Sequence, residues 1–320
     1  MNQHRFETDN APRWEETGHL VTLAEKRQWT PELERLPALF RQLCADLSLA
    51  QHRMYGAKLC GELNRLVLRA RNVLSRSGTG ETGGTGGSLW ATFPRAVRRE
   101  WRLLIVNMLL FWVPFLAFIA AAHYNERWIF AVLKDQDMSN LDRMYGQENA
   151  GAFLRDKFGS DFGMFGFYVY NNISIGLRTI AGGVLATVGA VFSTALQGVL
   201  LGASFGYVHY SGNTERFYPF VAGHSSFELM GLILCGVAGT RLGMAVIHPG
   251  VLSRAEALKV TARRALPIIY GGPLLVLLAA FVEGFWSASS APPELKLAVG
   301  AALWLLLAAY LLLAGRERRA

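Results

Sequence analysis

A histidine and a glutamate stand four residues apart where a long apolar run begins. His224 and Glu228 lie in the stretch Gly223–Gly231, and the run continues to His248-Pro249-Gly250. Side chains four residues apart share one face of a helix, so this pair can act on a single proton or ligand. Insertion scales assign about 2.5–3.5 kcal/mol to an ionised side chain at the bilayer centre, and such residues usually carry a function. The search for function therefore begins at this pair.

Further polar side chains fall at a similar depth in two other apolar runs. Asn171 and Asn172 occupy the outer half of a span expected at 164–182, and Glu283 lies near the outer end of one expected at 265–285. Counting about 1.5 Å per residue brings these side chains to the level of the histidine–glutamate pair. The sequence therefore predicts a polar cluster in the outer half of the membrane.

Three interpretations of this cluster stay open. Asn171, His224, Glu228 and Glu283 are typical of a path for a proton, cation or solute, because two neighbouring carboxylates favour a shared proton or a bound cation. The same amides, histidine and carboxylates are typical of interhelical hydrogen bonds that fix a bundle. The third interpretation is a face on which a partner protein docks.

The spacing of His224 and Glu228 is also that of two metal ligands on one helix. A zinc site needs three or four ligands, and no convincing third ligand is found beyond Glu283. The sequence contains no HExxH zinc motif and no Walker lysine motif, and its three cysteines lack CxxC spacing. We therefore predict no metal, no cofactor and no enzymatic activity.

Two arginines fall near the opposite, inner ends of their spans. They are Arg178 and Arg241. Glu228 and Arg241 are thirteen residues apart, which is about 20 Å along one helix, so these two side chains cannot pair. We predict that both arginines extend towards the cytoplasmic interface, as long basic side chains do.

Long apolar runs divide the C-terminal part of the chain into membrane spans. The chain is 52% apolar and 18% charged, a mixture that indicates a soluble part joined to a membrane part. A helical span needs roughly 20 apolar residues, and the qualifying runs are 103–122, 164–182, 184–208, 221–247, 265–285 and 296–314. Whether 164–208 is two spans or one bent element stays open. The predicted fold class is an all-α, polytopic transmembrane helical bundle of about six spans.

Arginine clusters mark the expected cytoplasmic ends of the spans. Arg95, Arg98, Arg99 and Arg102 precede the first span, and Arg316, Arg318 and Arg319 follow the last. Positive charge accumulates in cytoplasmic segments, so we predict the cytoplasmic (inner) membrane, with both termini in the cytoplasm. The same arginines explain the net charge of +8. Nucleic-acid binding is not predicted, because no groove-reading motif accompanies them.

The remaining segments differ from one another in composition. Residues 1–77 predict a small cytoplasmic helical bundle, because apolar residues recur there at three- and four-residue steps. Residues 78–94 read as a glycine-rich flexible linker with a basic lead-in, and 95–320 as the transmembrane domain. Within that domain, the acidic segment 123–162 predicts an extracytoplasmic loop whose short amphipathic helices lie on the membrane surface.

Glycines recur at four-residue steps in two of the spans. Gly198, Gly202 and Gly206 form two consecutive GxxxG steps, and Gly239 and Gly243 form another. Small residues at this spacing let helix backbones approach closely. The pattern fits internal helix packing and also the seam of a homodimer.

Several motifs resemble the stage II sporulation protein M family of integral membrane proteins. They are Asn171-Asn172-Ile173, His224-x-x-x-Glu228-Leu229, Ala238-Gly239-x-x-Leu242-Gly243, Pro249-Gly250 and Glu283-Gly284-Phe285. The central family signature reads approximately His-Gly-x-x-Glu-Leu-Pro-Ala, whereas Ser225 follows the histidine here and Met230 replaces the proline. The resemblance covers about residues 100–320.

The N-terminal segment is similar to the extension found in longer, non-sporulating members of that family. Phe40-Arg41-x-x-x-x-Asp46-Leu47 and Leu63-Asn64-x-Leu66-Val67 match this extension, although Arg71 stands where those members tend to have histidine. The order and spacing of the motifs carry the resemblance more than any single motif does.

The resemblance implies a role in membrane assembly. The family's named member acts in engulfment during sporulation together with peptidoglycan-remodelling partners, and long members often occur beside MoxR-type ATPases. We therefore expect a non-enzymatic membrane component that organises an envelope-associated complex, with the lipid bilayer, envelope proteins or a cytoplasmic ATPase as partners, and a homodimer as a further option. The alternative is a transporter or channel that uses the intramembrane asparagine, histidine and glutamate cluster.

Overall fold

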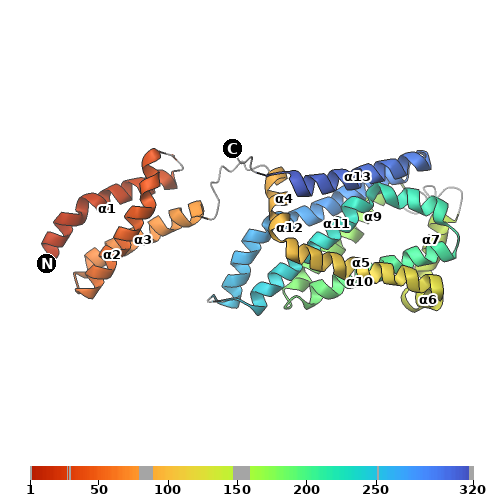
Figure 1. The fold of residues 1–320 in the computed structure, drawn as a ribbon, viewed down its shortest axis with the longest axis horizontal. Helices are drawn as coiled ribbons and strands as arrows, with labels where there is room; N and C mark the ends of the chain where they lie inside the picture. Colours follow the sequence, from red (N-terminus) through yellow and green to blue (C-terminus); the bar gives the residue numbers. More distant parts are fainter. Residues whose placement is uncertain are drawn as a thin grey trace. The chain divides into compact units, whose positions relative to one another are not determined.

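The chain forms two compact helical units, residues 1–87 and 88–320. The computed structural model describes residues 2–26, 28, 30–78, 89–146, 159–250 and 252–316, and no strand occurs among them (Figure 1). Most of the predicted linker, residues 147–158 of the acidic segment, and the last arginines lie outside the described residues.

The N-terminal unit is a bundle of three helices. Helix α1 spans Gln3–Glu25, α2 spans Leu36–His52 after a short 3-10 helix at Pro31–Arg35, and α3 spans Ala57–Gly78. The apolar positions of the three helices face one another, and the buried ones are Phe6, Leu20, Val21, Leu36, Leu39, Leu43, Ala50, Leu59, Leu63, Ala70 and Val73. The predicted N-terminal helical region is confirmed.

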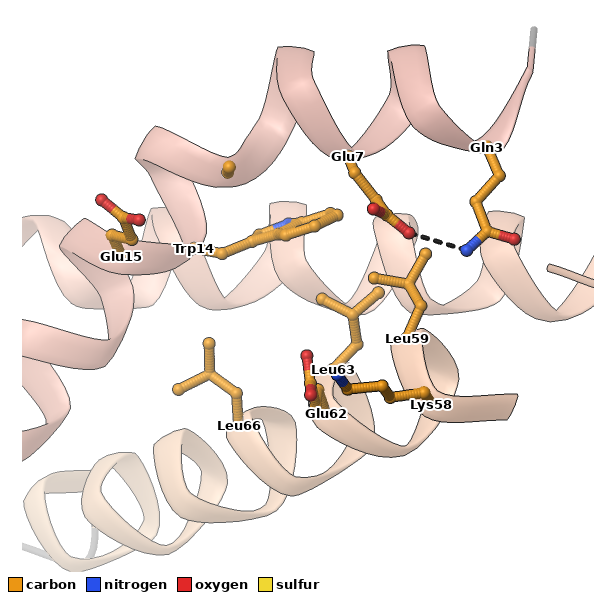
Figure 2. Close-up of a pocket in the computed structure, with 10 residues that line it drawn as sticks. Gln3, Glu7, Trp14, Glu15, Lys58, Leu59, Glu62, Leu63 and Leu66 are labelled. Atoms are coloured by element: carbon orange, nitrogen blue, oxygen red, sulfur yellow. Dashed lines mark hydrogen bonds between the residues drawn. The ribbon is translucent and has the colours of Figure 1, made fainter. Parts of the chain in front are cut away.

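A partly buried carboxylate ties α2 to α1 inside this unit. The Arg13 guanidinium donates to Asp46 Oδ2 at 2.6 Å, and the Trp14 indole N–H donates to the same oxygen at 2.9 Å. The Asp46 side chain is only 13% exposed, so both hydrogen bonds are shielded from water. This contact fixes Trp14, whose ring faces α3 (Figure 2).

The second unit contains five helices that are long and apolar enough to cross a membrane, among the residues described. They are α5 (Trp101–Tyr124), α10 (Val188–Tyr210), α11 (Thr214–Ile247), α12 with its continuation (Arg254–Ser287) and α13 (Pro293–Leu313). Of the most apolar stretch of α11, 78% is buried, compared with 17% to 44% in the other four helices. Helix α11 is therefore the central helix, packed against α5, α9, α10, α12 and α13. The predicted all-α multi-pass membrane protein is confirmed.

The sixth predicted span, 164–182, is part of a helix that is less apolar than the other five. Helix α9 spans Asp161–Gly183 and packs against α10, α11 and α12, but its composition does not place it among the candidate spans. It contains Asn171, Asn172 and Arg178, which lower its apolar content. A turn at 184–187, with Ala186 and Thr187 at positive φ, separates α9 from α10. The stretch 164–208 thus forms two helices and not one bent element.

The segment before the first span is helical. Helix α4 spans Leu89–Arg99, so part of the predicted linker and lead-in is ordered. Its apolar side chains Phe93, Ala96 and Val97 are buried, and the helix packs against α12 and α13. The Arg98 guanidinium donates to the carbonyl oxygens of Leu311 and Ala314, which occupies carbonyls at the end of α13.

Two short helices of the predicted outer loop pack onto the bundle. Helix α6 spans Arg127–Val132 and α7 spans Asp135–Tyr145. Ile129 and Tyr145 are buried against residues of the long helices, whereas Trp128 on the other face of α6 is 52% exposed. The apolar residues of these helices are thus divided between the bundle and the exterior, and their location on the membrane surface stays a prediction.

The GxxxG glycines are used for packing within the chain. A side chain at Gly198 or Gly202 would meet the backbone carbonyl oxygens of Phe111 and Phe115 on α5, and one at Gly206 would meet Ala122. Gly239 lies against Thr179 and Ala190, and Gly243 lies against Gly183 and Thr187. Both patterns therefore serve internal contacts between helices.

We expect Gly202→Ala to separate α5 from α10 and to destabilise the protein. The added methyl group would lie 2.5 Å from the Phe115 carbonyl oxygen, and overpacking of this kind costs about 1–3 kcal/mol. Thermal unfolding in detergent measures the loss as a lower midpoint. Gly166→Ala is the matched control, because a methyl group there meets nothing within 4 Å. Equal midpoints for the two variants would contradict the α5–α10 contact.

We expect Asp46→Ala to loosen α1 within the N-terminal unit. The substitution removes two hydrogen bonds, one of them to an arginine, and hydrogen bonds to charged groups contribute roughly 2 kcal/mol each. Hydrogen exchange of the full-length protein should show faster exchange of α1 amides. The control is Asp9→Ala, since Asp9 is exposed and 3.9 Å from its partner Arg5. Unchanged exchange in Asp46→Ala would show that this contact does not hold α1.

Candidate functional site

Three elements of the membrane unit bring the predicted polar residues together. Asn171 and Asn172 come from α9, His224 and Glu228 from α11, and Glu283 from the π-helix Val282–Ser287 that continues α12. A nitrogen of His224 and one carboxylate oxygen from each of the two glutamates lie within 4.8 Å of one another. The cluster thus joins helices that are far apart in the sequence.

The two asparagines connect α9 to α11 through a chain of hydrogen bonds. Asn171 Nδ2 donates to Asn172 Oδ1 at 2.8 Å, and Asn172 Nδ2 donates to Glu228 Oε1 at 2.9 Å. Asn172 is buried, whereas Asn171 is exposed. Asn172 is therefore the asparagine that contacts the carboxylate, and Asn171 orients it.

The π-helix places two polar residues on the inner side of the bundle. Glu283 and Ser287 are both buried, at 7% and 1% exposure. The Lys296 ammonium group on α13 donates to the carbonyl oxygens of Ser287 and Ser289, at 2.8 and 2.7 Å. Lys296 thus satisfies carbonyl groups that the end of this helix leaves open. Short π-helical segments occur frequently at functional sites.

The two ring nitrogens of His224 have different neighbours. Nδ1 lies 3.0 Å from the Ser287 hydroxyl oxygen, and Nε2 lies 3.6 Å from Glu228 Oε2. The ring also packs edge-on against Phe220, with its centroid 5.6 Å away, and only 4% of His224 is exposed. Its orientation is therefore fixed, with Nε2 directed at the carboxylates.

The Glu283 carboxylate is buried without full hydrogen bonding. Its Oε2 has no close hydrogen-bond partner, and the buried Tyr168 hydroxyl group interacts with the Glu283 carboxylate only through a long contact. In the described part of the chain, no lysine or arginine pairs with Glu228 or Glu283. Two carboxyl groups thus lie close together in the bundle without a cationic side chain beside them.

A tyrosine at the end of α7 closes the cluster on another side. Tyr145 at the end of α7 is 4% exposed and packs edge-on against Phe217 and Phe220. Burial raises the pKa of Tyr145 well above its usual range, and the negative charges of Glu283 and Glu228 raise it further. The Tyr145 hydroxyl therefore stays protonated and can act only as a neutral donor or acceptor.

The two arginines that were predicted to face the cytoplasm lie away from the cluster and differ from each other. Arg178 is exposed on α9. Arg241 pairs instead with Glu100, with 3.3 Å between Nε and Oε1, and the Glu100 side chain is only 13% exposed. Arg241 thus has an opposite charge beside it at the start of α5, and the extension of both arginines to the cytoplasmic interface stays a prediction.

Several residues of the site were not singled out from the sequence. Ser287, Tyr168 and Lys296 all contact or approach the cluster. The four-residue spacing from Glu283 to Ser287 was a usable signal, since both residues end an apolar run. Tyr168 and Lys296 carry no comparable signal, because their contacts depend on how α9 and α13 are rotated about their helix axes.

One apparent catalytic motif has a structural explanation. Residues 202–206 read Gly-Ala-Ser-Phe-Gly, which has the letters of a hydrolase nucleophile elbow. That motif requires a strand-to-helix turn, whereas these residues lie inside α10. The Ser204 hydroxyl donates to the Leu200 carbonyl oxygen at 2.9 Å. The serine is therefore part of the helix and is not presented as a nucleophile.

Comparison with known families agrees with the motifs. The family described as stage II sporulation protein M matches residues 103–288, which include all five residues of the cluster. A domain of unknown function (DUF8413) matches residues 4–76, the helices of the N-terminal unit. No curated protein and no solved structure matches the chain. The resemblance drawn from the sequence is confirmed: the chain belongs to the stage II sporulation protein M family of integral membrane proteins, in a long form with an additional N-terminal domain.

Proposed function

We propose that this protein is a non-enzymatic membrane component that organises an envelope-associated complex. In this proposal the N-terminal unit lies in the cytoplasm and docks a partner protein. The loop at 123–162 lies on the other side of the inner membrane and contacts envelope proteins. The arginines before α5 support the cytoplasmic placement of this end. If α9 crosses the membrane with the five more apolar helices, both ends of the chain lie in the cytoplasm.

The observation that carries the proposal is a groove in the N-terminal unit. It lies between α1 and α3 and has a volume of about 480 Å³. Figure 2 shows Trp14 from α1 above the leucines of α3, which are Leu59, Leu63 and Leu66. An apolar groove between two helices is a common binding site for a third, amphipathic helix.

The rim of the groove indicates which helix it accepts. Glu7, Glu15 and Glu62 line the groove together with a single basic residue, Lys58. Gln3 donates to Glu7 at 2.7 Å and so positions this carboxylate at one end (Figure 2). Charge complementarity favours a partner whose apolar face is flanked by lysine or arginine. We propose that the groove binds a basic amphipathic helix of a cytoplasmic protein. The family resemblance implies that this protein is an ATPase.

We expect a photo-crosslinking residue at Ala11 to capture this partner in intact membranes. Ala11 lines the groove, and Ala38 is an exposed alanine on α2 that serves as the control position. Mass spectrometry should map the Ala11 crosslinks to one basic amphipathic helix of one protein. Because like charges across an interface cost several kcal/mol, Glu15→Lys with Glu62→Lys should reduce the crosslink at least ~10-fold.

The matched charge control is Glu32→Lys with Glu34→Lys, two exposed residues that do not line the groove. This pair should leave the crosslink unchanged. Three outcomes would each contradict the docking proposal. They are equal capture from Ala38, an unaltered crosslink yield in Glu15→Lys with Glu62→Lys, and recovery of the lone protein under gentle detergent.

A second candidate function is transport of a proton or cation through the polar cluster. The convergence of Asn172, His224, Glu228 and Glu283 favours it. A transport path also needs a continuous route for water. The groove in the N-terminal unit and a cleft of about 460 Å³ between α5 and α10 are lined by other residues. The assembly proposal ranks first because the groove of the N-terminal unit supports it directly.

Proteoliposomes separate the two functions. A trapped pH-sensitive dye reports the rate of proton entry into liposomes. We expect this rate to be the same in liposomes with the wild type, in liposomes with Glu228→Gln and in protein-free liposomes. The reason is that His224 and Glu283 are enclosed and the hydrogen bonds of the cluster are internal. Proton entry that the wild type accelerates and Glu228→Gln abolishes would establish transport in place of assembly.

A further inference from the structure

We propose that His224, Glu228 and Glu283 bind a divalent transition-metal ion of the Zn²⁺ class. Their ligand atoms lie within 4.8 Å of one another. Around a tetrahedral zinc ion, with bonds of about 2.0–2.2 Å, ligand atoms lie roughly 3.4 Å apart. Binding an ion therefore requires the ligand atoms to approach one another by up to about 1.4 Å. From the sequence alone Glu283 had no fixed position, and the π-helix now supplies it as the third ligand.

Each ligand has one atom held by a neighbour and another directed into the cluster. The Ser287 hydroxyl holds His224 Nδ1, which leaves Nε2 facing the carboxylates. Asn172 holds Glu228 Oε1 at 2.9 Å, which leaves Oε2 on the side of the histidine. Metal-binding histidines almost always have their second nitrogen hydrogen-bonded in this way, because the bond fixes the ring and its tautomer.

A second observation comes from polar atoms that lack close partners. Glu283 Oε2 is buried without a close hydrogen-bond partner in a residue that is 7% exposed, and the Tyr168 hydroxyl group, in a residue that is 6% exposed, interacts with the Glu283 carboxylate only at longer range. Native structures rarely leave buried polar atoms unpaired, and such atoms often mark the place of an ion or water. A dication between the two carboxylates would balance their charge, which no basic side chain does among the residues described.

The set of donor atoms selects the class of metal. One imidazole nitrogen with carboxylate oxygens suits zinc and the neighbouring first-row ions, whereas magnesium and calcium prefer ligand shells made of oxygen alone. Three protein ligands also leave one position open for water, and Tyr168 stands beside Glu283 to contact it. The site lies in the membrane unit and does not depend on the groove of the N-terminal unit.

Metal titration of the full-length protein tests this proposal. The protein is purified in detergent with a histidine-free tag, stripped with a chelator and titrated with Zn²⁺ and with Co²⁺. We expect one saturable ion per chain that excess Mg²⁺ or Ca²⁺ does not displace. His224→Gln, Glu228→Gln and Glu283→Gln should each weaken Zn²⁺ binding by at least ~10-fold, and Ser287→Ala by about 10-fold through lost orientation of the histidine.

The controls are Glu215→Gln on the same helix and His248→Gln just after it, both exposed, which should bind as the wild type does. The proposal is overturned if the wild type shows no saturable Zn²⁺ binding. It is also overturned if the His224, Glu228 and Glu283 variants bind Zn²⁺ as the wild type does. X-ray absorption of the Zn²⁺-loaded wild type keeps the test valid if a variant fails to fold. One imidazole with oxygen ligands is expected, and a shell containing sulfur or oxygen alone would also overturn the proposal.

Discussion

Helix α11 lies in the middle of the membrane unit, and glycines let its neighbours approach it closely at several contacts. A side chain at Gly231 would meet Val276 and the Gly272 carbonyl of α12, and one at Gly239 would meet α9. Glycine at such contacts lets backbones pack closely, which is the main source of stability between helices in lipid. His224 and Ser226 of α11 are consequently buried, and the partners of His224 and Glu228 include side chains of the adjoining elements.

This enclosure determines the character of the polar cluster. His224 is buried and the Glu228 side chain is only 18% exposed, and Ser287 from the π-helix and Asn172 from α9 hydrogen-bond them. These bonds satisfy the neutral groups but leave two neighbouring carboxyl groups without a cationic side chain. Burying an ionised group without a partner costs far more than leaving a neutral group unpaired. A bound proton or a bound metal ion can relieve this, and the direction of His224 Nε2 towards the carboxylates favours the metal ion.

The sequence was sufficient for properties that depend on position along a helix. Apolar runs located the long helices, and counting residues brought Asn172, His224 and Glu228 to one level. Rotation about the helix axis and contacts between distant segments could not be counted in this way. For that reason the pairing of Arg241 with Glu100 and the support of the π-helix by Lys296 emerged only in three dimensions. Helix α4 was assigned in part to the linker because its short apolar face has no meaning until α12 and α13 cover it.

The N-terminal unit shows how one residue can connect stability with recognition. Asp46 belongs to a motif that was noted only for its resemblance to the family, yet its carboxylate holds both Arg13 and the Trp14 indole. The opposite side of the same ring lines the groove. A side chain that is already fixed loses little conformational freedom when a partner binds, so more of the contact energy appears as affinity. If the groove accepts a basic amphipathic helix, Asp46 therefore contributes to binding without touching the partner, by holding Trp14 in place before the partner arrives.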